Sequence, residues 1–396
     1  MSYPPIESIP KGNTRLAVVL SHPIQYYAPW FRWMASHSNF TLKVFYLWNA
    51  GVTAKLDQKF GRVIAWDIDL ISGYEHEFVA NRAKSPDTEH FNGLNNPDLK
   101  KRLAVWGPSA ILLFGYAYRT HLSLIFNSPA PLIFRGDSHL LGQPKPSWVK
   151  KLALRFLYGR FAAITYVGKA NEQYFLTFGV PEHKLQFAPH CVNAEYFKPN
   201  TENRAAAASL RQELGLDDKR VILFAGKLVP AKQPRELLEA FLSIASETDA
   251  LVITGDGSEK PGLITLAAQH PDKCVHFLPF ANQSEMPARY LLADIFVLPS
   301  RGNYETWGLA VNEAMHMEVP CIVSDRVGCQ LDLVTEGETG WVFKIGDTQG
   351  LSNALKRALQ CDRNSMKTSI AERISQYTYT QATDGLKLAL NKAISS

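Results

Sequence analysis

Two glutamates, Glu305 and Glu313, flank a tryptophan-glycine break in the stretch NYETWGLAVNEAM, which runs on into an apolar pattern with helical spacing. The free N–H groups and positive dipole end of a helix that starts near Gly308 favour an anion such as a phosphate. A carboxylate only accepts hydrogen bonds and therefore suits the hydroxyl groups of a sugar. The alternative is that Glu305 lies in a solvated loop and Glu313 on a helix surface. Because both acids sit at a strand-end loop and the helix after it, we favour a function.

Two lysines form a second group. In VILFAGKLVPAKQPRELLEAF, a predicted strand ends at Gly226, and Lys227 and Lys232 follow before a helix. Two cations that converge at the carboxyl end of a strand suit a diphosphate. The alternative is a pair of solvated loop lysines, the common fate of this residue.

Polar residues also follow strands in the first half of the chain. His22 follows the strand TRLAVVLS, and FRGDSH places Asp137, Ser138 and His139 after a later one. Such groups can position an acceptor or act in acid–base chemistry. Single histidines are, however, more often structural or solvated.

The elements that carry these residues are short apolar runs that alternate with helical patterns. Buried strands linked by helices are typical of a parallel sheet covered on both faces. We expect a helix after the first strand, with Pro23 at its first position. A polar stretch near residues 195 to 218 predicts a linker with one short helical piece, and a second α/β series follows it. The sequence thus predicts two doubly wound domains, and a ligand site in the cleft between them.

Composition excludes several classes of protein. The chain has 396 residues, 46% of them hydrophobic, with a net charge of +5 and scattered basic residues, so nucleic acid is not an expected partner. Its five cysteines show no CxxC spacing, which argues against a zinc site or disulfide framework and for a reducing compartment. No signal peptide or membrane-spanning segment is predicted, and GxGxxG is absent, which argues against a nicotinamide enzyme. We expect a cytoplasmic protein.

A GDG turn in LVITGDG is best explained as a tight turn.

One segment allows two interpretations. In KPSWVKKLALRFLYGRF, residues 145–161, cations and apolar residues alternate at helical spacing. Such a helix can lie on an anionic membrane surface. An ordinary amphipathic helix with a solvated basic face is the alternative, and we prefer it because the segment must also pack on its own sheet.

The second half of the chain resembles the retaining glycosyltransferases of family 4, which have the GT-B fold. The motifs that carry the resemblance run in family order over about residues 221 to 345: FAGKLVPAKQPRELLEAF, LVITGDG, VHFLPF, YLLADIFVLPS, ETWGLAVNE, EAMHMEVPCIVSD and VTEGETGWVF. The first half resembles the family only in layout. The resemblance implies two Rossmann-like domains that face each other across a cleft: an acceptor domain at 1–200, a donor domain at 201–375, and a C-terminal helix at 376–396 that packs back on the first domain.

The resemblance also implies a role for each matched residue. Glu305 would bind hydroxyls of the donor sugar, Glu313 the nucleotide ribose, and the amides near Gly308 and Leu309 the distal phosphate. Lys227 and Lys232 would neutralise the diphosphate without a metal or other cofactor. The predicted donor-binding set is Gly226, Lys227, Lys232, Glu305, Thr306, Trp307, Gly308, Leu309 and Glu313. The predicted catalytic residues are Glu305, His139 and Lys232, and the predicted acceptor-binding residues are His22, Gln25, Asp137, Ser138 and His139.

The chain departs from the family pattern in three places. The first loop is SHPIQYY instead of a glycine pair, the interdomain segment reads HCVN from His190 to Asn193, and Asp332 stands where glutamate is common. The expected function is transfer of a hexose, with retention, from a nucleotide diphosphate sugar to a glycan or lipid-linked acceptor, in polysaccharide or glycolipid synthesis. The alternatives are another GT-B enzyme, such as a nucleotide-sugar epimerase, and a non-catalytic sugar-binding protein. A peripheral contact with the inner membrane surface is a separate hypothesis.

Overall fold

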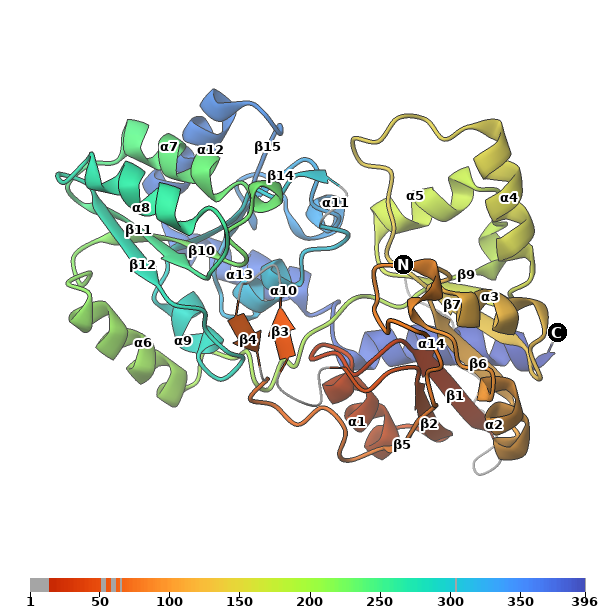
Figure 1. The fold of residues 1–396 in the computed structure, drawn as a ribbon. Coiled ribbons are helices and arrows are strands. Elements are labelled where there is room, and N and C mark those ends of the chain that lie inside the picture. Colours follow the sequence, from red (N-terminus) through yellow and green to blue (C-terminus); the bar gives the residue numbers. More distant parts are fainter. Residues whose placement is uncertain (1–13, 51–54, 58–61, 65, 303–304, 396) are drawn as a thin grey trace.

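The computed structural model describes residues 14–50, 55–57, 62–64, 66–302 and 305–395. Most of the segment on which the signal-peptide prediction rests, residues 1–13, lies outside the described residues, as do Asn303 and Tyr304. The chain forms two α/β domains that lie side by side (Figure 1).

The N-terminal domain is built on a seven-stranded sheet of order β5-β2-β1-β6-β7-β8-β9, in which the pairings are parallel. Its central strands are almost wholly buried, as their unbroken apolar runs predict. The strands are β1 (Arg15–Leu20), β2 (Thr41–Tyr46), β5 (Glu75–Phe78), β6 (Ala110–Phe114), β7 (Leu132–Arg135), β8 (Ala163–Tyr166) and β9 (Leu185–Phe187). Between β2 and β5, β3 (Lys55–Asp57) and β4 (Arg62–Ile64) form an antiparallel pair.

Helices cover both faces of this sheet. One face packs against α2 (Leu99–Trp106), α3 (Arg119–Phe126), α4 (Trp148–Gly159) and α5 (Lys169–Thr177). The other face packs against α1 (Ala28–His37) and α14 (Tyr379–Ser395). Short 3-10 turns lie at Phe91–Gly93 and Glu182–Lys184.

The C-terminal domain has a six-stranded sheet of order β12-β11-β10-β13-β14-β15, also paired in parallel. The strands are β10 (Arg220–Ala225), β11 (Asp249–Thr254), β12 (Cys274–Leu278), β13 (Ile295–Leu298), β14 (Cys321–Ser324) and β15 (Gly340–Phe343). The helices are α6 (Thr201–Glu213), η3 (Pro230–Lys232), α7 (Pro234–Ile244), α8 (Lys260–Ala268), α9 (Met286–Leu291), α10 (Leu309–His316), α11 (Gln330–Leu333), α12 (Thr348–Gln360) and α13 (Arg363–Ile374).

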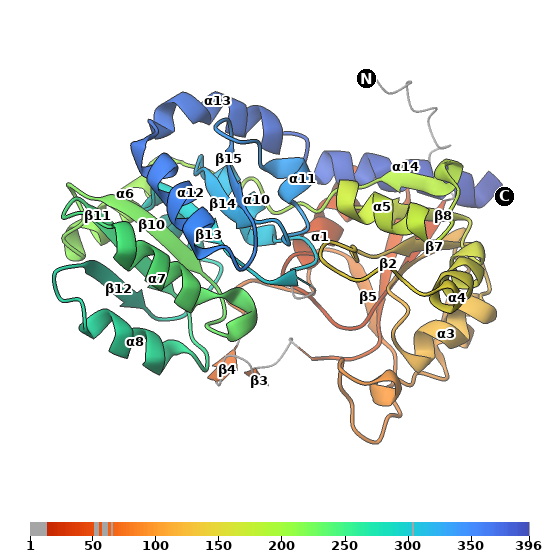
Figure 2. The ribbon, with the colours of Figure 1, turned by 90° about the horizontal axis from the view of Figure 1, so that it is seen from above.

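The last helix returns to the first domain (Figures 1 and 2). Apolar side chains of α14, including Leu386 and Leu390, join the cluster beneath β1 and β2. The indole Nε1 of Trp30 donates to Thr383 Oγ1 at 2.9 Å. At Gly385 the helix comes so close to β9 that a Cβ would lie 1.8 Å from the Phe187 carbonyl oxygen. Both ends of the described chain therefore belong to one domain.

Two expectations about local structure are wrong. The first helix begins at Ala28, with Pro29 in its first turn, and not at Pro23. Residues before it form a turn, in which the Tyr27 and Ala28 N–H groups both donate to the Ile24 carbonyl. The predicted linker contains α6, which has 13 residues and contacts α9, so most of it is part of the second domain.

The apolar pattern does not predict strand β5, because β5 is a polar edge strand with the sequence EHEF. Its carboxylates Glu75 and Glu77 lie 3.1 and 3.0 Å from the ammonium of Lys43 on the neighbouring strand β2. No helix of the described residues is both long and apolar enough to cross a membrane.

Candidate active site

A cavity of about 520 Å³ lies between the two domains, beyond the carboxyl ends of β10 and β13. This is where open parallel sheets bind their ligands. Both domains contribute to its walls. The lining residues are Ile24, Gln25, Tyr26, Tyr27, Trp66, Asp137 and His190 from the first domain, and Ala225, Gly226, Lys227, Lys232, Thr254, Gly255, Phe280, Ala281, Gln283, Met286, Tyr290, Glu305, Thr306, Trp307, Gly308, Leu309, Ala310 and Glu313 from the second.

Glu305 and Lys232 form an ion pair in this cavity. Ser300, just beyond β13, donates a hydrogen bond to the same Glu305 oxygen at 2.9 Å. Lys232 ends the turn η3, and Gln233 then takes a left-handed conformation, with φ of 52°, at the start of α7. Both charged side chains are mostly buried, so an incoming anion would meet Lys232 already held in place.

Glu313 lies one turn into α10 and its side chain is buried. Burial raises the pKa of its carboxyl to about 7, while interactions with Tyr290, Tyr26 and Gln283 act in the opposite direction. Tyr290 donates to Oε2 at 2.7 Å, whereas Oε1 accepts no hydrogen bond from any described residue. A buried acceptor without a donor is costly, so Oε1 is suited to a ligand hydroxyl group.

The N-terminus of α10 also faces the cavity, with Gly308, Leu309 and Ala310 in its wall. Gly308 has φ of 101°, and a Cβ there would lie 2.9 Å from Val327 Cγ1, so glycine is required for both reasons. The first N–H groups of a helix have no partner within it and attract an anion. A phosphate group can therefore bind at the same wall as Lys227 and Lys232.

The glycines of the GDG turn allow a close approach of two loops. A Cβ on Gly255 would lie 2.0 Å from the carbonyl oxygen of Gly226. A Cβ on Gly257 would lie 2.4 Å from that of Leu228. Both glycines let the β11 loop support the loop that carries Lys227.

Two of the predicted acceptor residues make contacts that join the domains. Asp137 accepts a hydrogen bond from Thr306 Oγ1 at 2.8 Å and lies 3.5 Å from His190 Nε2. Burial acts to raise the pKa of Asp137, but His190 and Thr306 outweigh it and lower the value to about 2. His139 Nδ1 accepts from the Leu141 N–H at 3.1 Å, so its Nε2–H is the group that donates to the Glu305 carbonyl at 3.2 Å. His139 thus holds the Glu305 loop by its backbone.

The remaining predicted acceptor residues do not all lie at the cavity. Gln25 lines the cavity, but His22 and Ser138 do not. His22 Nδ1 is 3.0 Å from Ser21 Oγ, and the Ser138 carbonyl accepts from Asn171 Nδ2 at 2.7 Å. Trp307 lines the cavity but is itself buried, and its indole Nε1 donates to Asn312 Oδ1 at 2.8 Å.

Several residues of the cavity wall were not among the predicted site residues. Tyr26 reaches Glu313 from the first domain, and Trp66 lies near Phe280 of the second, with 6.4 Å between ring centroids. Next to Trp66, Asp67 accepts a hydrogen bond from the Ser284 N–H at 3.0 Å. Tyr26 lies in the same SHPIQYY loop as His22, and this position after a strand could have marked it as a site residue. Trp66 has no comparable signal.

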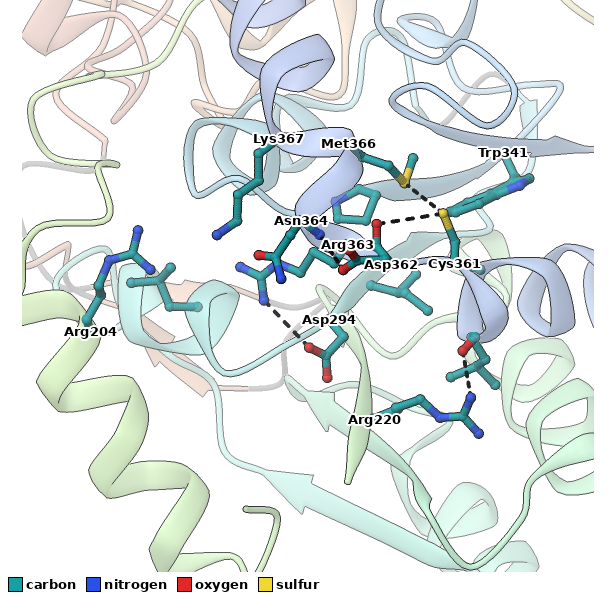
Figure 3. Close-up of a pocket in the computed structure, with 15 residues that line it drawn as sticks. Arg204, Arg220, Asp294, Trp341, Cys361, Asp362, Arg363, Asn364, Met366 and Lys367 are labelled. Atoms are coloured by element: carbon teal, nitrogen blue, oxygen red, sulfur yellow. Dashed lines mark hydrogen bonds and ion pairs between the residues drawn. The ribbon is translucent and has the colours of Figure 1, made fainter. Parts of the chain in front are cut away.

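A second cavity, of about 350 Å³, lies at the opposite, amino end of the C-terminal sheet (Figure 3). Its cations are already bound to protein groups. Arg363 donates to the Ala293 carbonyl at 2.7 Å and lies 3.7 Å from Asp294, and Arg220 donates to the Leu359 carbonyl at 2.6 Å. These arginines join α12 and α13 to the sheet, so we place the function in the interdomain cavity. Nowhere in the described ranges do three or more His, Cys, Asp or Glu residues gather in a metal-binding cluster.

Comparison with known proteins gives a match for most of the second domain. Residues 207–381 match the family model described as "Glycosyl transferases group 1". Residues 207–381 are thus similar to the group 1 glycosyltransferases, and the domain that they form is called the group 1 domain below. The interdomain cavity is thus bounded on one side by the group 1 domain, which carries Lys227, Lys232, Glu305 and Glu313.

Relatives with assigned activities match part of the chain. A GDP-mannose-dependent alpha-(1-6)-phosphatidylinositol monomannoside mannosyltransferase of Mycolicibacterium smegmatis is 28% identical over 236 residues, which is 57% of this chain and 60% of that protein. The N-acetyl-alpha-D-glucosaminyl L-malate synthase of Bacillus anthracis is 28% identical over 175 residues, 43% of this chain and 44% of that protein. The matches therefore span about half the length of these relatives.

Solved structures match the whole fold. Anabaena HepE, solved in complex with UDP and glucose, gives a TM-score of 0.67 at 15% identity, covering 96% of this chain and 100% of that one. Sucrose-phosphate synthase from Thermosynechococcus elongatus gives 0.72 at 19% identity, covering 97% and 100%. These likenesses concern the fold alone, and they confirm the predicted GT-B arrangement of two Rossmann-like domains.

Proposed function

We propose that the protein transfers a hexosyl group from a nucleotide diphosphate sugar to a hydroxyl group of a glycan or lipid-linked acceptor, with retention of anomeric configuration. The observation that carries this proposal is the wall of the interdomain cavity in the group 1 domain. There the Glu305–Lys232 pair, the N-terminus of α10 and the buried Glu313 follow one another. A nucleotide sugar presents a hexose, two phosphates and a ribose in the same order.

Each group has a proposed role in donor binding. Lys232 and Lys227 neutralise the diphosphate, and the first N–H groups of α10 bind its distal phosphate. Glu305 accepts hydrogen bonds from the hexose hydroxyls, and Glu313 Oε1 accepts one from the ribose. Trp66 and Phe280 also line the cavity and offer aromatic surface on which a base can stack.

The proposed reaction breaks the bond between the anomeric carbon and the diphosphate oxygen and forms a bond to the acceptor oxygen on the same face. The acceptor's hydroxyl proton leaves with the diphosphate. Positive groups fixed around the diphosphate stabilise the charge that develops as it departs, and this requires no metal. Gln25 and Asp137 line the wall of the first domain and are our candidates for acceptor contact.

We also propose a cytoplasmic location and a role in surface polysaccharide or glycolipid synthesis. The five cysteines are free, which fits a reducing compartment. The mannosyltransferase relative, named for a phosphatidylinositol-linked acceptor, supports a glycolipid or glycan as acceptor here.

A thermal-shift panel of nucleoside diphosphates and nucleotide sugars tests donor binding. A ligand at 100 times its Kd stabilises the folded state by about 2.7 kcal/mol, so one base should stand out, with or without EDTA. Transfer is then measured with the selected donor and a panel of glycan and lipid-linked acceptors, and NMR gives the anomeric configuration of the product. Nucleotide release that needs no acceptor, with epimerised sugar as product, would support the epimerase alternative. Sugar binding without any nucleotide would support the non-catalytic one.

A further inference from the structure

Helix α4 exposes large apolar side chains to solvent. The exposed fractions are 72% for Trp148, 56% for Val149, 57% for Leu152 and 66% for Phe156. Scattered single apolar residues are normal on a protein surface, but a contiguous group of this size marks a surface that binds something.

The exposed residues form one stripe of the helix. At 100° per residue, Trp148, Leu152, Phe156 and Val149 fall within an arc of about 100°. The opposite side of α4, with Leu154, Leu157 and Tyr158, is buried in the core of the N-terminal domain. Packing on its own sheet therefore accounts for only one of the two apolar sides.

The stripe continues onto α3. The rings of Phe126 and Phe156 stack with centroids 6.0 Å apart and planes at 29°. Phe126 is the last residue of α3 and is exposed. Trp148, Val149, Leu152, Phe156 and Phe126 together are called the α4 patch below.

Basic residues surround the α4 patch. Lys150, Lys151, Arg155 and Arg160 are all exposed, and the Arg160 guanidinium lies 5.9 Å from the centre of the Phe126 ring. No Asp or Glu occurs from residue 138 to residue 171. The charge is also unevenly divided: residues 1–200 contain 22 Lys and Arg against 13 Asp and Glu, and residues 201–396 contain 20 against 24. The domain that carries the α4 patch is thus positive, and the other is negative.

The α4 patch lies on the side of the N-terminal domain away from the group 1 domain (Figures 1 and 2). It is joined to the cavity by the loop after β7, in which His139 contacts Glu305 and Ser147 caps α4 by accepting from the Lys150 N–H. A surface bound to α4 therefore leaves the cavity open.

We propose that the α4 patch docks the protein on a bilayer surface that contains anionic phospholipids. Trp148, Leu152 and Phe156 enter the interfacial region, where tryptophan is favoured, and the four cations meet lipid phosphates. Charge decides in favour of a lipid surface, because exposed cations in a segment without Asp or Glu, residues 138–171, complement the phosphates of anionic lipids. This proposal rests on the patch alone and stands or falls independently of the proposed function.

Vesicle flotation with the full-length protein tests it, with neutral phosphatidylcholine vesicles compared with vesicles that also contain phosphatidylglycerol. Wild type should float with the anionic vesicles and stay in solution with the neutral ones. Trp148→Ser/Phe156→Ser should weaken binding at least ~10-fold, since large apolar groups no longer leave water. Lys151→Gln/Arg155→Gln should weaken it about 30-fold at low salt and flatten its salt dependence.

Matched controls come from exposed residues elsewhere in the chain. Ile264→Ser removes an exposed apolar side chain from α8, and Lys344→Gln/Lys356→Gln removes two exposed cations from the group 1 domain. Both should bind vesicles like wild type. All variants should keep the wild-type melting temperature, because the substituted side chains are exposed.

Three outcomes would overturn the proposal. Wild type that stays in solution with anionic vesicles is one, and equal binding by the patch variants and the controls is another. The third is self-association of the wild type in light scattering that Trp148→Ser/Phe156→Ser abolishes while vesicle binding is absent, which would make the α4 patch a contact between copies of the chain.

Discussion

The carboxylate of Asp332 accepts hydrogen bonds from the backbone N–H of Lys169, at 3.1 Å to one oxygen and 3.0 Å to the other. Asp332 lies in α11 of the group 1 domain, and Lys169 is the first residue of α5 in the N-terminal domain. A carboxylate at a helix N-terminus is favourable because the helix dipole is positive there. This contact fastens the two domains beside the cavity.

The Asp332 contact should make stability depend on pH. Burial raises the pKa of Asp332 to about 6, and the Lys169 N–H and the Tyr377 hydroxyl only partly oppose it. Since the folded-state pKa lies above the unfolded value of about 3.9, the contribution of this group is fully present below about pH 4 and is lost as pH rises through 6. The loss is on the order of 3 kcal/mol.

The test is the melting temperature of wild type and Asp332→Asn from pH 4 to pH 7. Asparagine does not ionise, so the advantage of the wild type over the variant should shrink across this range. Asp272→Asn, at an exposed aspartate of the same domain, should show no such trend. Parallel profiles for wild type and Asp332→Asn would refute the assignment.

A methyl group at Gly168 should push the domains apart. Its Cβ would lie 2.4 Å from Trp307 Cζ3 and 2.7 Å from Asp332 Oδ2. Its φ is 175°, an extended value open to any residue, so the effect of Gly168→Ala is purely steric. We expect a loss of about 1–3 kcal/mol and a larger radius of gyration in small-angle scattering. Gly159→Ala, where nothing lies within 4 Å, is the matched control and should change neither.

Donor binding should strengthen with pH around neutrality. Glu313, with its pKa raised to about 7 by burial, is largely protonated below that value, whereas a ribose hydroxyl binds better to the ionised form. Affinity for a nucleotide sugar should therefore rise up to tenfold per unit from pH 6 to 7 and level off above pH 8. Calorimetry at each pH measures this.

The matched variant is Glu313→Gln, which should bind more weakly and show a flat pH profile. A nucleotide sugar is the proper ligand, because its esterified phosphates do not titrate near neutrality. An unchanged slope in Glu313→Gln would assign the titration to another group.

Glu305 should serve transfer more than binding. Glu305→Gln removes the negative charge that strengthens hydrogen bonds from sugar hydroxyls, and it frees Lys232 from its ion pair. We expect kcat to fall by about 10²-fold or more, as for loss of a group that acts in the transition state, while affinity for the nucleoside diphosphate is kept or improves. Lys232→Met should instead mainly weaken binding of the nucleoside diphosphate. Wild-type turnover in Glu305→Gln would contradict the role.

The residues of the proposed donor wall could be located from the sequence because their signals are local. Glu305, Gly308 and Glu313 lie within nine positions, and the break between strand and helix that sets their geometry is made by the same stretch. The central strands were equally predictable, since a strand buried on both faces is an unbroken apolar run. Strand β5 was missed because ion pairs with Lys43, and not burial, hold its polar residues at the edge.

Contacts between distant parts of the chain were decided only by the tertiary structure. His139 was predicted to meet substrate, yet it holds the Glu305 carbonyl, 166 positions away in the chain. Tyr26 and Trp66 complete the cavity from the first domain, although nothing near them in the sequence points to Glu313 or Phe280. Local patterns fix which residues stand at strand ends. Which strand ends face each other depends on the angle and distance between the two packed domains. That angle and distance depend on contacts across the whole interface, which no local pattern contains.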